Sequence, residues 1–199
     1  MPDDTSPRLP HWHFWLPLAL QVALVLAVPA RSAYTYVTGQ TAFLRVGPVD
    51  PYELLRGYSQ TLNLAISRRS QLQDLSGWEQ LLAQSRSEQD PNQLAVGTAF
   101  YVILEASEQE QQAWMPVAVR AQRPSDLPAD RIALRGRQKR YGIDYGLDRY
   151  YLPEGQREAI NERIRELAPS ERMLLQVKVD RRGYAVPVRL WVGNRGYRF

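Results

Sequence analysis

The longest apolar run in the chain covers residues 14–33, reads FWLPLALQVALVLAVPARSA, and is interrupted only by Gln21 before Arg31. Twenty helical residues extend about 30 Å, which matches the hydrocarbon core of a bilayer. Aromatic residues suited to the headgroup level stand at both ends: Trp12, Trp15, Tyr34 and Tyr36. The pattern predicts one transmembrane helix at residues 14–33, with residues 1–13 as an N-terminal tail and residues 34–199 as a globular domain.

Two other interpretations of the apolar run stay open. Val28-Pro29-Ala30 resembles the cleavage site of an export signal, although only Arg8 supplies firm positive charge before the run. A buried helix of a soluble protein is the third interpretation, but such a helix normally has a polar face. Pro17 and Pro29 lie near the ends of the run, where a helix tolerates proline. Nearby Lys and Arg residues are too few on either side to fix the orientation.

Apolar and polar residues alternate in several stretches of the domain, which is the period of a half-buried strand. Residues 100–106 and 114–121 are expected to pair as a hairpin, with Pro116 placing the second strand at a sheet edge or a bulge. Further strands are expected at residues 41–46, 58–67, 132–136 and 141–147. In the last of these, Tyr141, Ile143, Tyr145 and Leu147 share one face.

The clearest pattern is a C-terminal hairpin, in which residues 173–179 and 184–192 flank the turn DRRG. A simple two-residue alternation gives an inward face of Met173, Leu175, Val177, Val179, Tyr184, Val186, Val188, Leu190 and Val192. Apolar spacings of three and four predict two short helices, one over residues 71–87 and one from about Glu154 to Pro169. The fold class is therefore α+β: a mostly antiparallel sheet or small barrel with two short helices.

Charge is distributed unevenly along the chain. Residues 120–199 carry a net charge of +8, whereas residues 1–119 carry −4. A basic surface favours solubility, contact with anionic lipid, or nucleic acid. The run RGRQKRY at residues 135–141 mixes basic and aromatic side chains as a nucleic-acid surface does. A membrane anchor argues against nucleic acid as the partner.

Most catalytic signatures are absent from the sequence. It has no cysteine, and its two histidines, His11 and His13, lie beside the apolar run, so the domain has no imidazole for a Ser-His pair or a zinc site. A serine nucleophile with a lysine base would have to use Lys139 or Lys178. No glycine-rich phosphate loop is present, and we expect neither a cofactor nor a metal. Four carboxylates remain as possible acid, base or cation ligands: Asp50, Asp144, Asp148 and Glu154.

Two separated blocks carry a resemblance to a known family. They read DPYELLRG at residues 50–57 and RYYLPEG at residues 149–155, and together they make the chain similar to the GDYXXLXY family of bacterial proteins. The naming motif is altered here, because Tyr58, Ser59 and Leu64 stand where the family has Asp, Tyr and Tyr. The resemblance implies one N-terminal hydrophobic segment, a domain outside the cytoplasm, and a multi-pass membrane protein as a neighbour.

The resemblance also supplies the candidate site. Arg56 can bind a carboxylate in bidentate fashion, and Glu154 or Asp50 would be its partner at one loop end. The full motif cluster, structural or binding, is Asp50, Pro51, Arg56, Gly57, Tyr151, Pro153, Glu154 and Gly155. We expect a membrane-anchored protein with a non-enzymatic binding or assembly role. The alternatives are a membrane-bound hydrolase that uses carboxylates and a module that binds anionic lipid.

Overall fold

A computed structural model describes residues 12–47, 60–61, 64–88, 90–109, 111–147, 149–150, 162 and 173–198. The chain divides into two compact units, Met1–Tyr34 and Thr35–Phe199. The described part of the second unit is built mainly from antiparallel strands with short helical segments, so the predicted α+β class is confirmed.

The apolar run lies in helix α1 (Trp12–Thr38), which contains both Pro17 and Pro29. Within the described residues, no single helix is long and apolar enough to count as a membrane span. Phe14–Ala27 and Pro29–Thr38 meet that requirement only together, with a bend of 46° between them. Proline has no N–H for the helical ladder and crowds the carbonyl four residues earlier, which explains a bend at Pro29. The single transmembrane helix of the sequence prediction is therefore shown only as a bent pair of helical segments.

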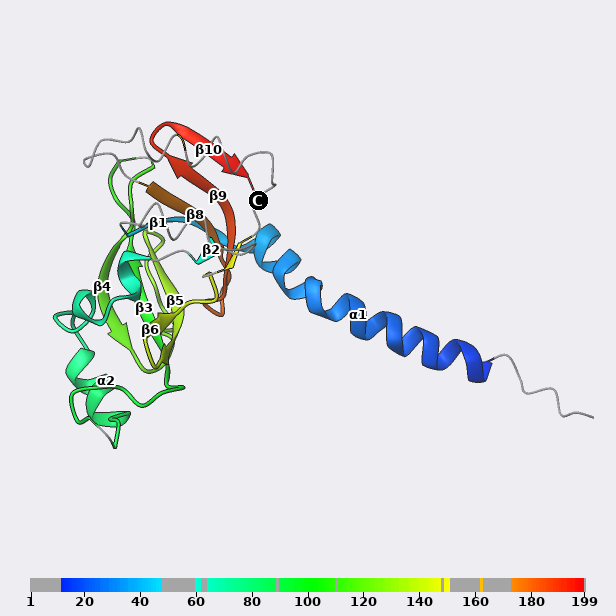
Figure 1. Cartoon of the computed structure of the whole chain (residues 1–199), viewed down its shortest axis with the longest axis horizontal. Helices are drawn as coiled ribbons and strands as arrows, with labels where there is room; N and C mark the ends of the chain where they lie inside the picture. Colours follow the sequence, from blue (N-terminus) through cyan, green and yellow to red (C-terminus); the bar gives the residue numbers. More distant parts are fainter. Residues whose placement is uncertain are drawn as a thin grey trace, which may run out of the picture. The chain divides into compact units, whose positions relative to one another are not determined.

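Two four-stranded antiparallel sheets form the domain, and Figure 1 shows both. The first has the order β1-β8-β9-β10, with β1 at Gln40–Arg45, β8 at Met173–Val179, β9 at Ala185–Val192 and β10 at Arg195–Arg198. The second has the order β4-β3-β5-β6, with β3 at Ala99–Glu105, β4 at Met115–Arg120, β5 at Arg131–Lys139 and β6 at Gly142–Asp144. A short ladder joins β2 (Gln60–Thr61) to β7 (Arg149–Tyr150). No ladder between described strands closes the sheets into a barrel, so the barrel alternative is wrong.

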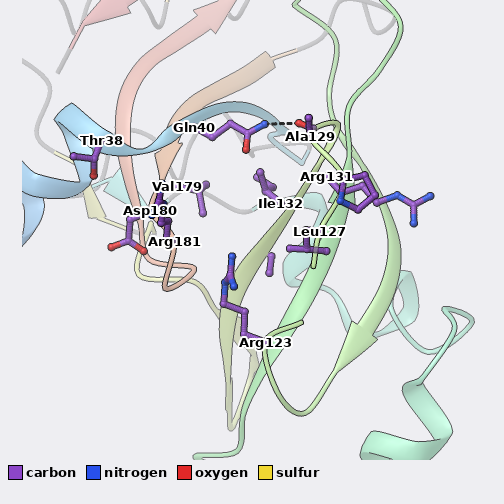
Figure 2. Close-up of a pocket in the computed structure, with 12 residues that line it drawn as sticks. Thr38, Gln40, Arg123, Leu127, Ala129, Arg131, Ile132, Val179, Asp180 and Arg181 are labelled. Carbon is purple, nitrogen blue, oxygen red and sulfur yellow. Dashed lines mark hydrogen bonds between the residues drawn. The ribbon is translucent and has the colours of Figure 1, made fainter. Parts of the chain in front are cut away.

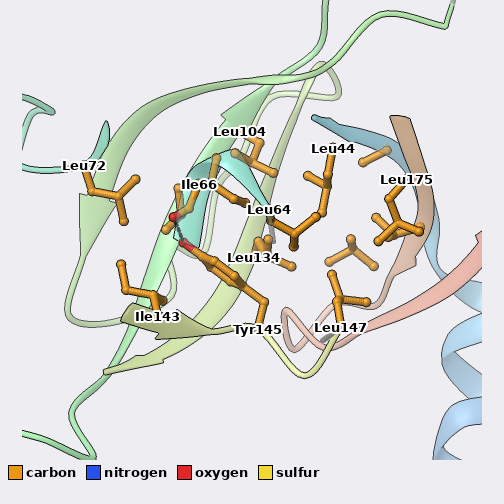
Figure 3. Packing of buried hydrophobic residues seen from close by; sticks show 14 of the residues in the cluster. Leu44, Leu64, Ile66, Leu72, Leu104, Leu134, Ile143, Tyr145, Leu147 and Leu175 are labelled. Carbon is orange, nitrogen blue, oxygen red and sulfur yellow. Dashed lines mark hydrogen bonds between the residues drawn. The ribbon is translucent and has the colours of Figure 1, made fainter. Parts of the chain in front are cut away.

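One apolar core joins the two sheets. Leu44 and Leu175 come from the first sheet and pack in the same cluster as Leu104 and Leu134 from the second, with Leu64 lying between them (Figure 3). All of these side chains are buried, and each Leu contributes about 1.5–3 kcal/mol by leaving water. Tyr145 is also buried and donates a 2.8 Å hydrogen bond from its hydroxyl to the carbonyl of Ile66. The core therefore holds the two layers together.

Both predicted hairpins are present, and each has a bulge beside a proline. β3 pairs with the edge strand β4, where Pro116 lies opposite Leu104 and the register shifts, as the sequence predicts. β8 pairs with β9, where Pro187 lies opposite Val177 and Val188 is the extra residue. A bulge reverses which side chains face inward on one side of it.

That bulge makes part of the predicted inward face of the terminal hairpin wrong. Leu190 and Val192 are buried as expected, but beyond the bulge it is Ala185, not Val186, that packs against the core. The chain then continues into β10, which the sequence prediction lacks. Gly193 has φ 57° at the first position of the two-residue β9–β10 turn, and Gly-Asn is a common pair for this kind of turn.

Three further predictions need correction. Residues 58–67 do not form one strand, because Leu64 makes an isolated bridge to Val46 and Ala65–Ser67 is a 3-10 turn, η2. The helix predicted over residues 71–87 is shortened to α2 (Trp78–Gln84), and Arg69–Gln71 is a second 3-10 turn, η3. Val119, in the edge strand β4, donates its backbone N–H to the carbonyl of Ser76. This hydrogen bond keeps the segment before α2 outside the helix.

The strand predicted over residues 141–147 is reduced to β6. Ile143, Tyr145 and Leu147 are buried as expected, but Tyr141 lies in the β5–β6 turn and is 93% exposed. Gly142 has φ 95°, which accounts for the sharp turn at this point. The second predicted helix, from about Glu154 to Pro169, lies almost wholly outside the described residues.

Candidate functional site

The motif cluster from the family resemblance lies outside the described residues. This holds for all eight positions: Asp50, Pro51, Arg56, Gly57, Tyr151, Pro153, Glu154 and Gly155. The proposed meeting of Arg56 with Glu154 or Asp50 therefore stays a prediction. Of the four carboxylates considered as acids or bases, only Asp144 is described.

Asp144 has structural partners close to it in the chain. Its Oδ1 accepts a 2.7 Å hydrogen bond from the backbone N–H of Gly146, and its Oδ2 lies 3.2 Å from Lys139 Nζ. The lysine side chain is more than half exposed. This partly exposed ion pair closes the β5–β6 hairpin, which is a structural role for both residues.

The described domain contains a polar pocket. It has a volume of about 270 Å³ and lies where the start of β5, the end of β8 and the loop before β5 meet the segment between α1 and β1 (Figure 2). Three arginines line it: Arg123 from the loop, Arg131 from β5 and Arg181 from the β8–β9 turn. Leu127 and Ile132 supply an apolar part of the wall.

Asp180 is the acidic residue of the lining, and its carboxylate is saturated by neighbours. Oδ1 accepts hydrogen bonds from the backbone N–H groups of Arg182 at 2.8 Å and Tyr184 at 3.0 Å, and Oδ2 accepts one from Thr35 Oγ1 at 3.0 Å. Figure 2 shows the carboxylate turned toward the side of Thr38 and away from Arg123. Both Asp180 and Thr35 are buried. This carboxylate therefore builds the β8–β9 turn, and the pocket lining carries three arginines against this one aspartate.

Arg131 directs its charge out of the pocket. Its guanidinium donates to Glu105 Oε1 from Nε at 3.3 Å and from Nη2 at 2.9 Å, and it points away from the pocket centre in Figure 2. The hydrogen bond to Glu105 and the charge of that carboxylate raise the pKa of Arg131 above its ordinary value. This pair crosses from β3 to β5 and holds one wall of the pocket in place.

The two remaining arginines supply the pocket's available positive charge. Arg123 points toward the pocket centre in Figure 2, and its Nη1 donates a 3.0 Å hydrogen bond to the carbonyl of Pro124. Neither Arg123 nor Arg181 lies within ion-pairing distance of a carboxylate in the described part of the chain. Gln40 fixes the loop opposite them by donating a 2.9 Å hydrogen bond from Nε2 to the carbonyl of Ala129. The arrangement suits an anion.

The described side chains offer little for catalysis. In the ranges that the structure describes, no group of three His, Cys, Asp or Glu residues gathers at one point. The buried phenol of Tyr145 has a pKa raised above its ordinary value because burial disfavours the charged form, so it stays neutral and cannot act as a base near pH 7. Arg135 of the basic run bonds the hydroxyl of Tyr184 and lies over its ring, 5.0 Å from the centroid.

Sequence reasoning missed the pocket because three separate segments contribute to it, at residues 38–40, 123–133 and 179–181. Thr38, Arg123 and Arg181 are distant in the chain, and no spacing rule links them. The signal present in the sequence was the excess of arginine after residue 119, which indicated a basic surface without placing it.

The chain belongs to the GDYXXLXY family, whose pattern it matches over residues 21–190. The match includes both sequence blocks that carried the resemblance and most of the apolar run. No protein with a curated description and no solved structure is similar enough to match.

Proposed function

We propose that this chain is a single-pass, membrane-anchored protein of the bacterial envelope whose domain binds or assembles with a partner and performs no reaction of its own. Its domain lies on the outer side of the membrane, beside a multi-pass membrane protein. The observation that carries the proposal is the apolar character of α1. Its large apolar side chains are exposed around the helix, among them Trp15, Leu20 and Leu24. A helix that packs in a soluble core buries one face.

The binding role rests on the composition of the pocket. Arginines, a glutamine amide and backbone groups recognise charge and shape, whereas general acid–base catalysis needs a group that titrates near the working pH. The rival hydrolase would use the carboxylates Asp50, Asp144, Asp148 and Glu154. Replacing Asp144 with Asn in that case would abolish activity, whereas a structural role predicts only a weakened hairpin.

Membrane sidedness can be tested directly because the chain has no cysteine. Tyr141 is 93% exposed, so Tyr141→Cys gives one accessible thiol in the domain, and Ser6→Cys gives one before the apolar run. In intact cells, a membrane-impermeant maleimide should label Tyr141→Cys and leave Ser6→Cys unlabelled until the cells are opened. The reverse labelling pattern would place the domain in the cytoplasm.

The partner can be sought by crosslinking in intact membranes. A photoreactive residue at Arg123, in the pocket loop, is compared with one at Arg86, which is exposed and outside the pocket lining. A specific adduct with one membrane protein from the first position and not from the second supports an assembly role at this face. Identical adducts from both positions would argue for chance encounters.

A further inference from the structure

We infer that the pocket formed by Arg123, Arg181 and Gln40 is a binding site for the phosphate of an anionic lipid headgroup. The inference deepens the proposed function and rests on it, because it needs the domain to stand at a membrane surface. It names the chemistry of the ligand that this face of the domain takes.

Arginine side chains give the pocket positive charge. Arg123 and Arg181 approach the pocket from two different segments, and Asp180 is already bonded by Thr35 and by two backbone N–H groups. Arg131 is occupied by Glu105. Guanidinium groups match the geometry of phosphate oxygens and are more weakly hydrated than an ammonium group. Two arginines from different segments therefore supply positive charge to one pocket.

The pocket is small. The volume of about 270 Å³ lies below the range of about 300–1,000 Å³ that holds most drug-sized ligands. A phosphate with a small alcohol attached fits such a space better than a nucleotide or a peptide does. Leu127 and Ile132 give the wall an apolar part, against which the carbon atoms of a headgroup can pack.

The pocket includes a residue that lies close in the chain to the end of the apolar run. Thr38 lines the pocket, and the two residues before it, Tyr36 and Val37, are exposed. A tyrosine and an apolar residue in this position are typical of the membrane interface. Because only a few residues separate the apolar run from Thr38, a membrane that holds the run brings its headgroups to the level of the pocket. Phosphate in this setting comes from lipid rather than from solution.

The test uses the full chain in neutral detergent and calorimetric titration. The probes are dihexanoyl phosphatidylglycerol, dihexanoyl phosphatidylcholine and inorganic phosphate. We expect the anionic lipid to bind, the zwitterionic lipid to bind far more weakly, and phosphate to compete with the anionic lipid. Binding should weaken as salt rises, since exposed charges are screened within about 10 Å at 0.1 M salt.

The variants separate a site from a diffuse basic surface. Arg123→Gln and Arg181→Gln should each weaken binding of the anionic lipid by about fivefold, and the double variant by about 25-fold. The control Arg137→Gln/Arg182→Gln removes the same charge from exposed positions outside the lining, and Arg182 lies in the same turn as Arg181. It should change binding by less than about twofold. If the double variant does not fold by circular dichroism, the two single variants decide.

Four results would overturn the inference. Equal binding of both lipids would remove the role of charge, and an equal loss in the control variant would remove the role of the pocket. Inorganic phosphate that binds as tightly as the anionic lipid would overturn the lipid assignment. A chain that stays in the membrane but binds no anionic lipid refutes only this inference. A chain that leaves the membrane refutes the proposed function itself.

Discussion

Thr35 donates a hydrogen bond from Oγ1 to Asp180 Oδ2 over 3.0 Å, and both residues are buried although 145 positions separate them in the chain. The contact ties the last turn of α1 to the β8–β9 turn, which Asp180 also organises through Arg182 and Tyr184. The start of the domain is therefore fixed to the pocket wall by one charge-assisted hydrogen bond.

Replacing Thr35 with Val should remove that hydrogen bond while preserving side-chain shape. The buried carboxylate then loses one donor, so the free energy of unfolding should fall by about 1–3 kcal/mol. Thr41→Val is the matched control, because Thr41 lies half-buried in β1 and makes no side-chain hydrogen bond with a described residue. Its effect should stay within about 0.5 kcal/mol. Urea unfolding of the detergent-solubilised chain measures both, and equal losses would show that the Thr35 contact adds nothing.

Substitutions at two glycines allow the stability cost of backbone conformation to be measured apart from the cost of close packing. Gly183 and Gly97 have similar positive φ angles, 84° and 94°. A Cβ at Gly183 would lie 2.8 Å from the carbonyl oxygen of Ala133, whereas a Cβ at Gly97 would have no atom within 4 Å. Gly97→Ala should cost about 1–2 kcal/mol for the left-handed conformation alone.

Gly183→Ala should cost clearly more than Gly97→Ala. The substitution pushes the β8–β9 turn away from β5, where Arg135 donates its backbone N–H to the carbonyl of Gly183 at 2.8 Å. Thermal unfolding of the two variants under the same conditions gives the comparison. If both variants lost the same stability, the contact between the turn and β5 would not constrain the fold.

Tyr145 should make the domain less stable in alkali. Burial raises its pKa above the ordinary value of about 10, so the folded phenol keeps its proton at a pH where the unfolded one loses it. The stability from this group is complete below about pH 10 and falls as pH rises above it, by at most about 1.4 kcal/mol per pH unit.

Tyr145→Phe removes the loss of stability that this phenol causes in alkali, and it also removes the hydrogen bond to the Ile66 carbonyl. The variant should be less stable than the parent near pH 7 by about 1–3 kcal/mol, yet lose less stability between pH 9 and 11. Tyr141→Phe, at a 93% exposed position, should follow the parent over the whole range. Parallel pH curves for all three proteins would contradict a buried neutral phenol.

The sequence predicts local pattern well and long-range constraint poorly in this chain. Both hairpins were predicted because alternation and turn residues are properties of neighbouring positions. The bulge at Val188 and the turn around Ser76 were missed because each depends on a strand partner: Val177 opposite Pro187 in one case, and Val119 in the other. A one-residue shift of register then changed which side chains of β9 face the core.

For the candidate site, too, local sequence pattern was informative and long-range contacts were not. The blocks at residues 50–57 and 149–155 were found because they are contiguous, and they identified the family, although their structure lies outside the described residues. The arginine pocket was missed because Arg123 and Arg181 come to line one pocket only in the folded domain. Composition indicated positive charge in this half of the chain, but only the fold brings it to one place.

Membrane anchoring is tested by whether full-length protein stays in the membrane. Membranes from cells that express the chain are washed with sodium carbonate at pH 11, which removes proteins held only by surface contacts. A membrane anchor at residues 14–33 should keep the intact chain, with Trp12 and Trp15 still present by mass spectrometry, in the pellet. Full-length protein in the soluble fraction, or a mature form that begins near Arg31, would contradict a membrane-anchored protein.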